Sequence, residues 1–319
     1  MIEYIASLLH FCTIALTVGI NSVSVGIGEG LTSRAALKAI DKQPSAKNDI
    51  ARVAILGTAL IETSAIMGVT IAFFLLLGSH DITQSVPANI AEVGIALSIC
   101  LSGFIIGLAS SLPAQEACMS IARQPFFADK ILRFMLITQS IIQTPIIFGF
   151  IIALLIRSQA IHAQTLAQSF MLIAAGLCIG LGSIGPAIGL ALFAKNACRG
   201  LGINRKAYPQ LMSFTFISQA IIETPIIFAL TISLMFIFYG TTPTLFASLT
   251  WIAAAFCMGI GTLGPGIASG KTAAAAVHQI ALQPKYYSNI SKVSMFAQGL
   301  IDTCAIYSFL IAFFLILLT

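Results

Sequence analysis

The sequence predicts an all-α membrane protein whose eight transmembrane helices form four tandem hairpins. The chain has 319 residues, of which 58% are hydrophobic and only 8% are charged, whereas about a quarter of the residues in a soluble domain carry a charge. Long apolar stretches recur, and segments roughly 80 residues apart have similar sequences. This composition excludes a soluble enzyme, a disordered chain and a nucleic-acid-binding protein, and it points to a polytopic membrane protein.

Eight apolar stretches mark the expected helices, and each is at least as long as the ~20 residues that a bilayer core requires. They lie at 5–33, 49–77, 88–121, 128–156, 166–198, 208–239, 246–279 and 289–318. Residues 1–20 contain neither a basic n-region nor a small-residue cleavage pattern. We therefore interpret the first stretch as a spanning helix and not as a signal peptide that is removed.

Internal repeats indicate how the helices are grouped. The segment QSIIQTPIIFGF at 139–150 is nearly repeated by QAIIETPIIFAL at 219–230, and looser copies stand at 60–74 and 300–314. Aligning them divides the chain into hairpin 1 (1–79), hairpin 2 (80–160), hairpin 3 (161–240) and hairpin 4 (241–319). Because each repeat holds an even number of helices, all four hairpins have the same orientation in the membrane.

The basic residues predict which side of the membrane each loop occupies. All Lys and Arg residues except Arg157 lie in or beside four gaps, at 34–52, 123–133, 195–206 and 271–292. The alternate gaps, at 78–87, 157–165 and 239–245, are nearly uncharged. By the positive-inside rule we expect the four basic loops on the cytoplasmic side and both termini on the opposite side.

One aligned position carries an acid or an amide near the centre of the second helix of every hairpin. It is occupied by Glu62, Gln143, Glu223 and Asp302. An acidic side chain at the middle of a bilayer costs several kcal/mol and by default indicates function. Low dielectric favours its neutral form, so it loses its proton only where a cation or water stabilises the anion. The three acids are therefore candidate ion carriers, whereas Gln143 cannot exchange a proton and hairpin 2 should be silent.

Polar residues that recur around this position are candidate supports for the ion site. A threonine follows it in each hairpin: Thr63, Thr144, Thr224 and Thr303. Its hydroxyl could donate to the carboxylate or ligate a cation, or it could bond back to its own helix. One turn earlier stand Thr58, Gln139, Gln219 and Gln298. These share the acid's face of the helix and could bond either to the site or to a neighbouring helix.

The first helix of each hairpin is rich in small residues at aligned positions. One such set is Gly28, Ala109, Gly189 and Ala268, and another is Gly26, Gly107, Ala187 and Gly266. Small residues let helix backbones approach closely in lipid, so we expect a crowded layer of first helices, as a closed ring would require. A phosphate-binding loop is excluded because these glycines lie inside apolar helices, without a preceding strand or a Lys-Ser/Thr pair.

The basic loops share a short polar motif. Aligned positions carry Gln43, Gln124, Asn204 and Gln283, and proline follows in three of them, as Pro44, Pro125 and Pro284. Arg123 completes an Arg-Gln-Pro sequence in hairpin 2. Proline is tolerated at the start of a helix but cannot continue one, so each motif predicts a tight turn between helices.

Together, the glycine-rich helix, the Arg-Gln-Pro-type turn and the mid-helix acid resemble the c subunit of F-type ATP synthases, four times over. The resemblance implies a homo-oligomeric rotor ring with inner and outer helix layers in a bacterial inner membrane. Glu62, Glu223 and Asp302 would bind the coupling ion, and the loops with Arg123, Gln43, Gln124 and Gln283 would face the central stalk. A separate stator a subunit would supply an arginine. The resemblance implies no catalysis, cofactor or nucleic-acid partner for this chain itself.

The identity of the ion and two other functions stay open at this point. Sodium-binding members of the family carry a polar ligand on the first helix, where this chain has Glu29, Ser110, Leu190 and Ser269. Glu29 with Glu62 is similar to the two-carboxylate sodium site, whereas Leu190 leaves Glu223 without that ligand. We expect protons, with sodium as the alternative. The other functions are a V-type-like ATP-driven ion pump rotor and a secondary transporter built from parallel repeats.

Overall fold

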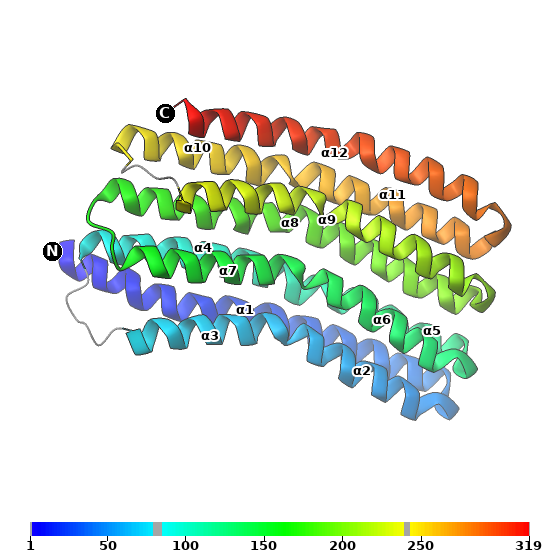
Figure 1. Cartoon of the computed structure of the whole chain (residues 1–319). Coiled ribbons are helices and arrows are strands. Elements are labelled where there is room, and N and C mark those ends of the chain that lie inside the picture. The colour runs from blue at the N-terminus through cyan, green and yellow to red at the C-terminus, as the bar shows by residue number, and fades with distance from the viewer. Residues whose placement is uncertain (1, 79–84, 239–242, 319) are drawn as a thin grey trace.

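The computed structural model describes residues 2–78, 85–238 and 243–318. In these ranges the chain forms four helical hairpins that lie side by side in chain order (Figure 1). Both termini lie at one end of the assembly, and the four tight turns between paired helices lie at the other. The hairpins are thus parallel repeats, as their sequences predict.

The helices of each hairpin follow the predicted stretches. Hairpin 1 contains α1 (Ile2–Lys42), α2 (Lys47–Ile61) and α3 (Thr63–Leu77), and hairpin 2 contains α4 (Val86–Ala109), α5 (Ser111–Arg123), α6 (Ala128–Ile142) and α7 (Thr144–Ala160). Hairpin 3 contains α8 (Leu166–Ile203) and α9 (Tyr208–Phe238), and hairpin 4 contains α10 (Leu245–Gly261), α11 (Leu263–Leu282) and α12 (Tyr287–Leu317). The described residues hold eight segments long and apolar enough to cross a membrane, which confirms the predicted number.

The turns are shorter than the basic gaps suggested. Each is a single 3₁₀ turn, at Pro44–Ala46, Pro125–Phe127, Arg205–Ala207 and Pro284–Tyr286. The first helix continues to Lys42 instead of ending near residue 33, because lysine, arginine and alanine favour helix whether or not the segment is in lipid. Of the predicted hairpin boundaries, 160/161 falls at the end of α7. The boundaries at 79/80 and 240/241 lie outside the described residues.

Four helices are interrupted by a single residue, which divides one membrane span into two helices. The interruptions fall at Glu62, Ser110, Gln143 and Thr262. At Gln143 the backbone N–H bonds to Ser140 three residues back, and Pro145 lacks the N–H that would continue the regular pattern. Proline alone does not decide this, because α9 continues as one helix through Pro225.

The hairpins form two layers of helices. The first helices, α1, α4–α5, α8 and α10–α11, pack against one another along their length, and the second helices form the other layer. A side chain at Gly28 would collide with the Gly107 carbonyl, and one at Gly189 with the Gly266 carbonyl. The aligned glycines therefore set the close approach of the first helices, which confirms the crowded layer predicted from the small residues.

Candidate functional site: a carboxylate column between hairpins

Gln143 shows where the aligned acid position lies in the fold. Its side chain is buried, and its amide nitrogen donates to the Leu60 carbonyl of hairpin 1 and to the Ser110 hydroxyl of its own first helix, both at 2.8 Å. The position thus faces two structures at once, the preceding hairpin and the interruption between α4 and α5. Ser110 is the hairpin 2 member of the aligned set that begins with Glu29, so that set also faces the site.

Glu223 and Asp302 occupy the same position in hairpins 3 and 4. The Glu223 carboxyl interacts with the Thr144 side chain of hairpin 2, and its Oε1 is buried without a hydrogen-bond partner among the described residues. Asp302 is buried, and its Oδ1 also lacks a described partner, as does the Ser269 hydroxyl of the same hairpin. These unpaired oxygens in an apolar interface are acceptors available to a proton or a small cation.

Glu62 differs because no described hairpin packs against hairpin 1 on the side where the other members meet a preceding hairpin. Its side chain is exposed, although it lies near the middle of the span Pro44–Leu77 like the other members. Glu29 on α1 is half-buried, and the two carboxyls lie close enough to interact electrostatically. The structure therefore brings Glu29 to Glu62, as expected from the alignment, but leaves this site open on one side.

The predicted supports divide into two groups. Thr224 and Thr303 donate their hydroxyl protons back to their own helices, at the carbonyls of Ala220 and Leu300. Thr144 bonds to no described backbone carbonyl and instead meets the carboxyl of the next hairpin. Thr63 is half-buried at the start of α3. Among the described threonines of this set, Thr144 is thus the one placed beside the carboxyl of the following hairpin.

The glutamines one turn before the column join neighbouring hairpins. Gln139 donates to the Gly57 carbonyl at 2.8 Å, and Gln219 donates to the Thr138 carbonyl at 3.2 Å. Gln298 approaches the Ser218 hydroxyl at 3.5 Å. No described hydrogen bond links these amides to a carboxylate, so of the two possibilities left open by the sequence the structure favours contact with the neighbouring helix.

The loop motifs lie at the opposite end from the termini and are largely exposed. Gln124 donates to the Gly202 carbonyl of hairpin 3 at 3.2 Å, whereas Gln43 bonds only to Ser45 in its own turn. Arg123 pairs with Glu116, and Phe126 in the same loop is 99% exposed. The loops together form one rim, a placement compatible with the predicted contact with a stalk, which stays a prediction.

A second charged cluster, which the sequence did not predict, lies at the end of the assembly that carries the termini. Glu92 of α4 is completely buried, and its two oxygens contact Arg157 of α7 at 2.6 Å and His10 of α1 at 2.5 Å. Among the Lys and Arg residues, Arg157 is the one that lies outside the four basic gaps. This exceptional position was the feature of the sequence that could have indicated a charged cluster here. The cluster ties hairpin 1 to hairpin 2 and leaves no unpaired acid there.

Removing one member of this cluster should destabilise the protein. Glu92→Gln leaves the Arg157 guanidinium largely buried without its counter-charge, at an expected cost of about 3–5 kcal/mol. The matched control is Glu92→Leu with Arg157→Ile, which copies the residues of hairpin 3 at these positions, Leu172 and Ile237. Thermal unfolding in detergent should show a clearly lower midpoint for Glu92→Gln than for the double variant. Equal midpoints would contradict a buried charge pair.

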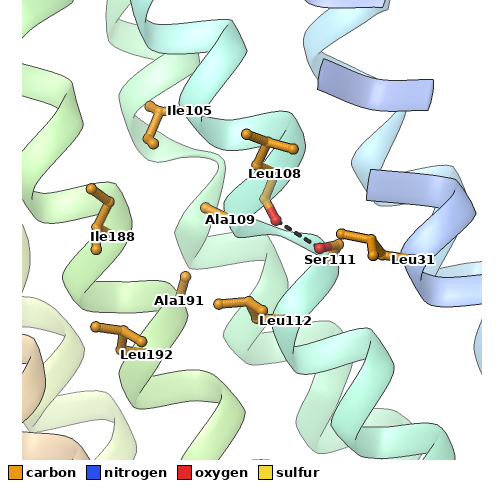
Figure 2. A pocket seen from close by; sticks show the side chains of 9 residues that line it. All are labelled: Leu31, Ile105, Leu108, Ala109, Ser111, Leu112, Ile188, Ala191 and Leu192. Atoms are coloured by element: carbon orange, nitrogen blue, oxygen red, sulfur yellow. Dashed lines mark hydrogen bonds between the residues drawn. The ribbon is translucent and has the colours of Figure 1, made fainter. Parts of the chain in front are cut away.

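An apolar pocket of about 240 Å³ lies between α1, the α4–α5 interruption and α8 (Figure 2). Its lining is almost entirely aliphatic, and the Ser111 hydroxyl there donates to the Leu108 carbonyl. Such a lining offers no charged group for an ion. None of the carboxyls of the aligned column lines this pocket.

Comparison with known proteins shows the same four-fold division. The family of ATP synthase C subunits matches at residues 12–75, 93–156, 173–236 and 252–315. The ATP synthase c subunit of Thermotoga petrophila is 40% identical over 67 residues, which are 21% of this chain and 79% of that protein. The ATP synthase c subunit of Dehalococcoides mccartyi is 39% identical over 72 residues, which are 23% of this chain and 95% of that protein. The four family matches fall one on each hairpin, so the chain belongs to the family of ATP synthase C subunits and carries the family's hairpin four times in one polypeptide.

Proposed function

We propose that this chain is the rotor subunit of a rotary ATP synthase and carries ions on Glu62, Glu223 and Asp302. The observation that supports this most strongly is the repeated placement of one polar side chain at the interface between consecutive hairpins, near the middle of each span. Family membership supports the same role. Nucleotide chemistry would belong to other subunits of the complex.

Electrostatics would couple ion movement to rotation. A loaded carboxyl is neutral and can face lipid, whereas an unloaded carboxylate at this depth is stable only beside a cation or water. An arginine on a separate stator a subunit would supply that cation. Each elementary charge that crosses the membrane potential contributes about 2.3 kcal/mol per 100 mV, which favours rotation in one direction.

The four basic loops would lie in the cytoplasm of a bacterial cell and contact the central stalk. In hairpins 1, 2 and 4 this contact would be made by the loop residues Gln43, Pro44, Arg123, Gln124, Pro125, Gln283 and Pro284. Hairpin 3 has Asn204 and Arg205 at the corresponding positions. Hairpin 2 would carry no ion because Gln143 bears an amide. Three ions would then move for every four hairpins that pass the stator.

We further propose that the coupling ion is a proton. Beside Glu223 the first-helix position is the buried aliphatic Leu190, and a sodium ion requires several oxygen ligands where a proton requires one. All sites in a ring must carry the same ion to couple cleanly, so the site poorest in ligands limits the choice. The pair of carboxyls at Glu29 and Glu62 can share a proton as well as hold a cation.

Carbodiimide labelling distinguishes the two ions, because the reagent attacks protonated carboxyls. We expect Glu223 and Asp302 in purified rings to label at low pH, with labelling that declines as the pH rises and is unaffected by sodium. Peptide mass spectrometry would assign each modified residue, and Gln143 provides an internal site that cannot react. Protection of Glu223 by millimolar sodium would instead identify a sodium-driven rotor.

A further inference from the structure

The four tight turns have the same backbone form but carry different side chains at their tips. Aligned tip positions, two residues after the glutamine or asparagine, carry Ser45, Phe126, Lys206 and Lys285. The next positions carry Ala46, Phe127, Ala207 and Tyr286. Phe126 is 99% exposed and Tyr286 is 58% exposed, whereas the two alanines are buried. Hairpins 2 and 4 therefore present an exposed aromatic ring at the tip of the turn, and hairpins 1 and 3 do not.

The two exposed rings lie too far from the membrane centre for lipid to cover them. Exposed bases stand ten residues before the carboxylate column in three hairpins, as Arg52, Arg133 and Lys292. At 1.5 Å per helical residue they lie about 15 Å from the column, which is half the ~30 Å thickness of the hydrocarbon core. Phe126 stands seven residues beyond Arg133, and Tyr286 stands six residues beyond Lys292. Both rings are thus about 25 Å from the column, outside the headgroup region, and they face water.

The described part of the chain covers the neighbours of these rings but not the rings themselves. The Phe127 ring meets the Tyr208 ring of hairpin 3 at 5.6 Å between centroids, and the Tyr287 hydroxyl bonds to Ser213 at 3.1 Å. Hairpin 2 already has a neighbour on both sides (Figure 1), yet Phe126 stays uncovered. Each of the two turns therefore has one aromatic residue that joins the hairpins and another that is free to meet a different protein.

Exposed bases stand beside both rings. Lys285 precedes Tyr286, and Lys130 follows Phe126 by four residues. Asp129 in the loop of hairpin 2 is paired with a base at 3.1 Å, and that pair is neutral. An aromatic ring beside a lysine fits an apolar pocket with carboxylates at its edge, because the ring is desolvated while the ammonium meets an opposite charge. The partner is therefore a protein with an acidic surface that contains apolar pockets.

We infer that Phe126 and Tyr286 anchor the central stalk by inserting into apolar pockets on an acidic foot, and that the turns of hairpins 1 and 3 contribute little to its attachment. This inference rests on the rotor function proposed above and assigns the stalk contact to two of the four turns. Buried aromatic anchors carry most of the affinity of a protein interface, whereas exposed charges mainly speed association. The stalk then attaches at every second hairpin along the row.

Photo-crosslinking in the intact complex tests which turns touch the stalk. The photoreactive residue p-benzoylphenylalanine would replace Phe126, Tyr286, Ser45 or Lys206 in four separate variants. We expect the first two to cross-link to a stalk subunit, identified by peptide mass spectrometry, with a yield roughly fivefold or more above that of the other two. Equal yields at all four positions would overturn the inference. Cross-links from Phe126 to lipid, to nucleic acid or to another ring would overturn it as well.

Rebinding of the peripheral ATPase sector tests the energetic role of the two rings. The probe is that sector with its stalk, stripped from the same membranes, and bound ATPase activity measures its return. Phe126→Ser with Tyr286→Ala gives hairpins 2 and 4 the small residues found in hairpin 1. It should raise the half-saturating concentration of the sector at least about tenfold, as expected for the loss of aromatic anchors.

The matched control for rebinding is Ser45→Ala with Lys206→Ser, which alters the turns of hairpins 1 and 3 and should raise that concentration by less than about threefold. Because all four side chains are exposed, neither double variant should lower the thermal midpoint of the ring. Equal losses in the two variants, or no loss in the first, would overturn the inference. If stripped membranes with the unaltered chain do not rebind the sector at all, the rotor function fails instead.

Discussion

Gln143→Glu should raise the number of ions moved per turn, from three to four for every chain in the ring. The position already has the contacts of a working site, since the Leu60 carbonyl, the Ser110 hydroxyl and the interface between hairpins are in place. A protonated glutamic acid would keep one of the two hydrogen bonds that the amide donates. Because the ATP yield per turn is set by other subunits, the ion-to-ATP ratio should rise in the same proportion.

The ratio can be measured from the electrochemical gradient at which ATP synthesis and hydrolysis balance in vesicles. With four ions in place of three, the balance should occur at a gradient about a quarter smaller, since each ion contributes the same energy per millivolt. Gln143→Leu is the control, because it removes the hydrogen bonds without adding a carrier and should leave the ratio unchanged. A ratio that stays the same in Gln143→Glu, despite carbodiimide reaction at the new carboxyl, would contradict the role of hairpin 2.

The sequence was sufficient for the architecture because the features that determine it are local and repeated. Long apolar stretches, a basic gap between the two helices of every hairpin and the near-identical segments at 139–150 and 219–230 each predict the same four hairpins. The aligned small residues predicted close contact between first helices, which the glycine carbonyl contacts confirm. Pro113 and Pro265 stand three residues after the helix interruptions at Ser110 and Thr262. Proline alone could not predict these interruptions, because α8 and α9 continue through Pro186 and Pro225.

Contacts between hairpins were the part that could not be predicted from the sequence. Alignment placed Gln143 in a column but could not show that its amide reaches the preceding hairpin, since the relative rotation of neighbouring helices depends on packing. The Glu92 cluster was missed for the same reason, because Glu92, Arg157 and His10 lie far apart in sequence and have no counterparts in the other repeats. Unlike the carboxylate column, a charged cluster that is present in only one place in the chain leaves no periodic signal in the sequence.

The silent hairpin predicts that the three carboxylates differ in how well their loss is tolerated. In the natural chain the neutral hairpin 2 already lies between Glu62 and Glu223. One hairpin without a carboxylate passing the stator therefore does not stop the rotor. Asp302→Asn creates one more gap of the same size, because hairpins 1 and 3 keep their acids. Glu223→Gln instead makes hairpins 2 and 3 neutral in succession, and it doubles the neutral stretch that must pass the stator arginine.

Asp302→Asn should therefore retain coupled ATP synthesis with fewer ions per turn, whereas Glu223→Gln should lose nearly all of it. During the longer gap the stator cation has no carboxylate partner at a depth where an unpaired charge costs about 2.5–3.5 kcal/mol, which corresponds to a rate loss of roughly a hundredfold. Glu62→Gln should behave like Glu223→Gln, because it makes hairpin 1 neutral beside hairpin 2. ATP-driven proton pumping in vesicles with equal ring content would measure all three. Equal defects in the three variants would show that the order of neutral hairpins is irrelevant, since only their number would then matter.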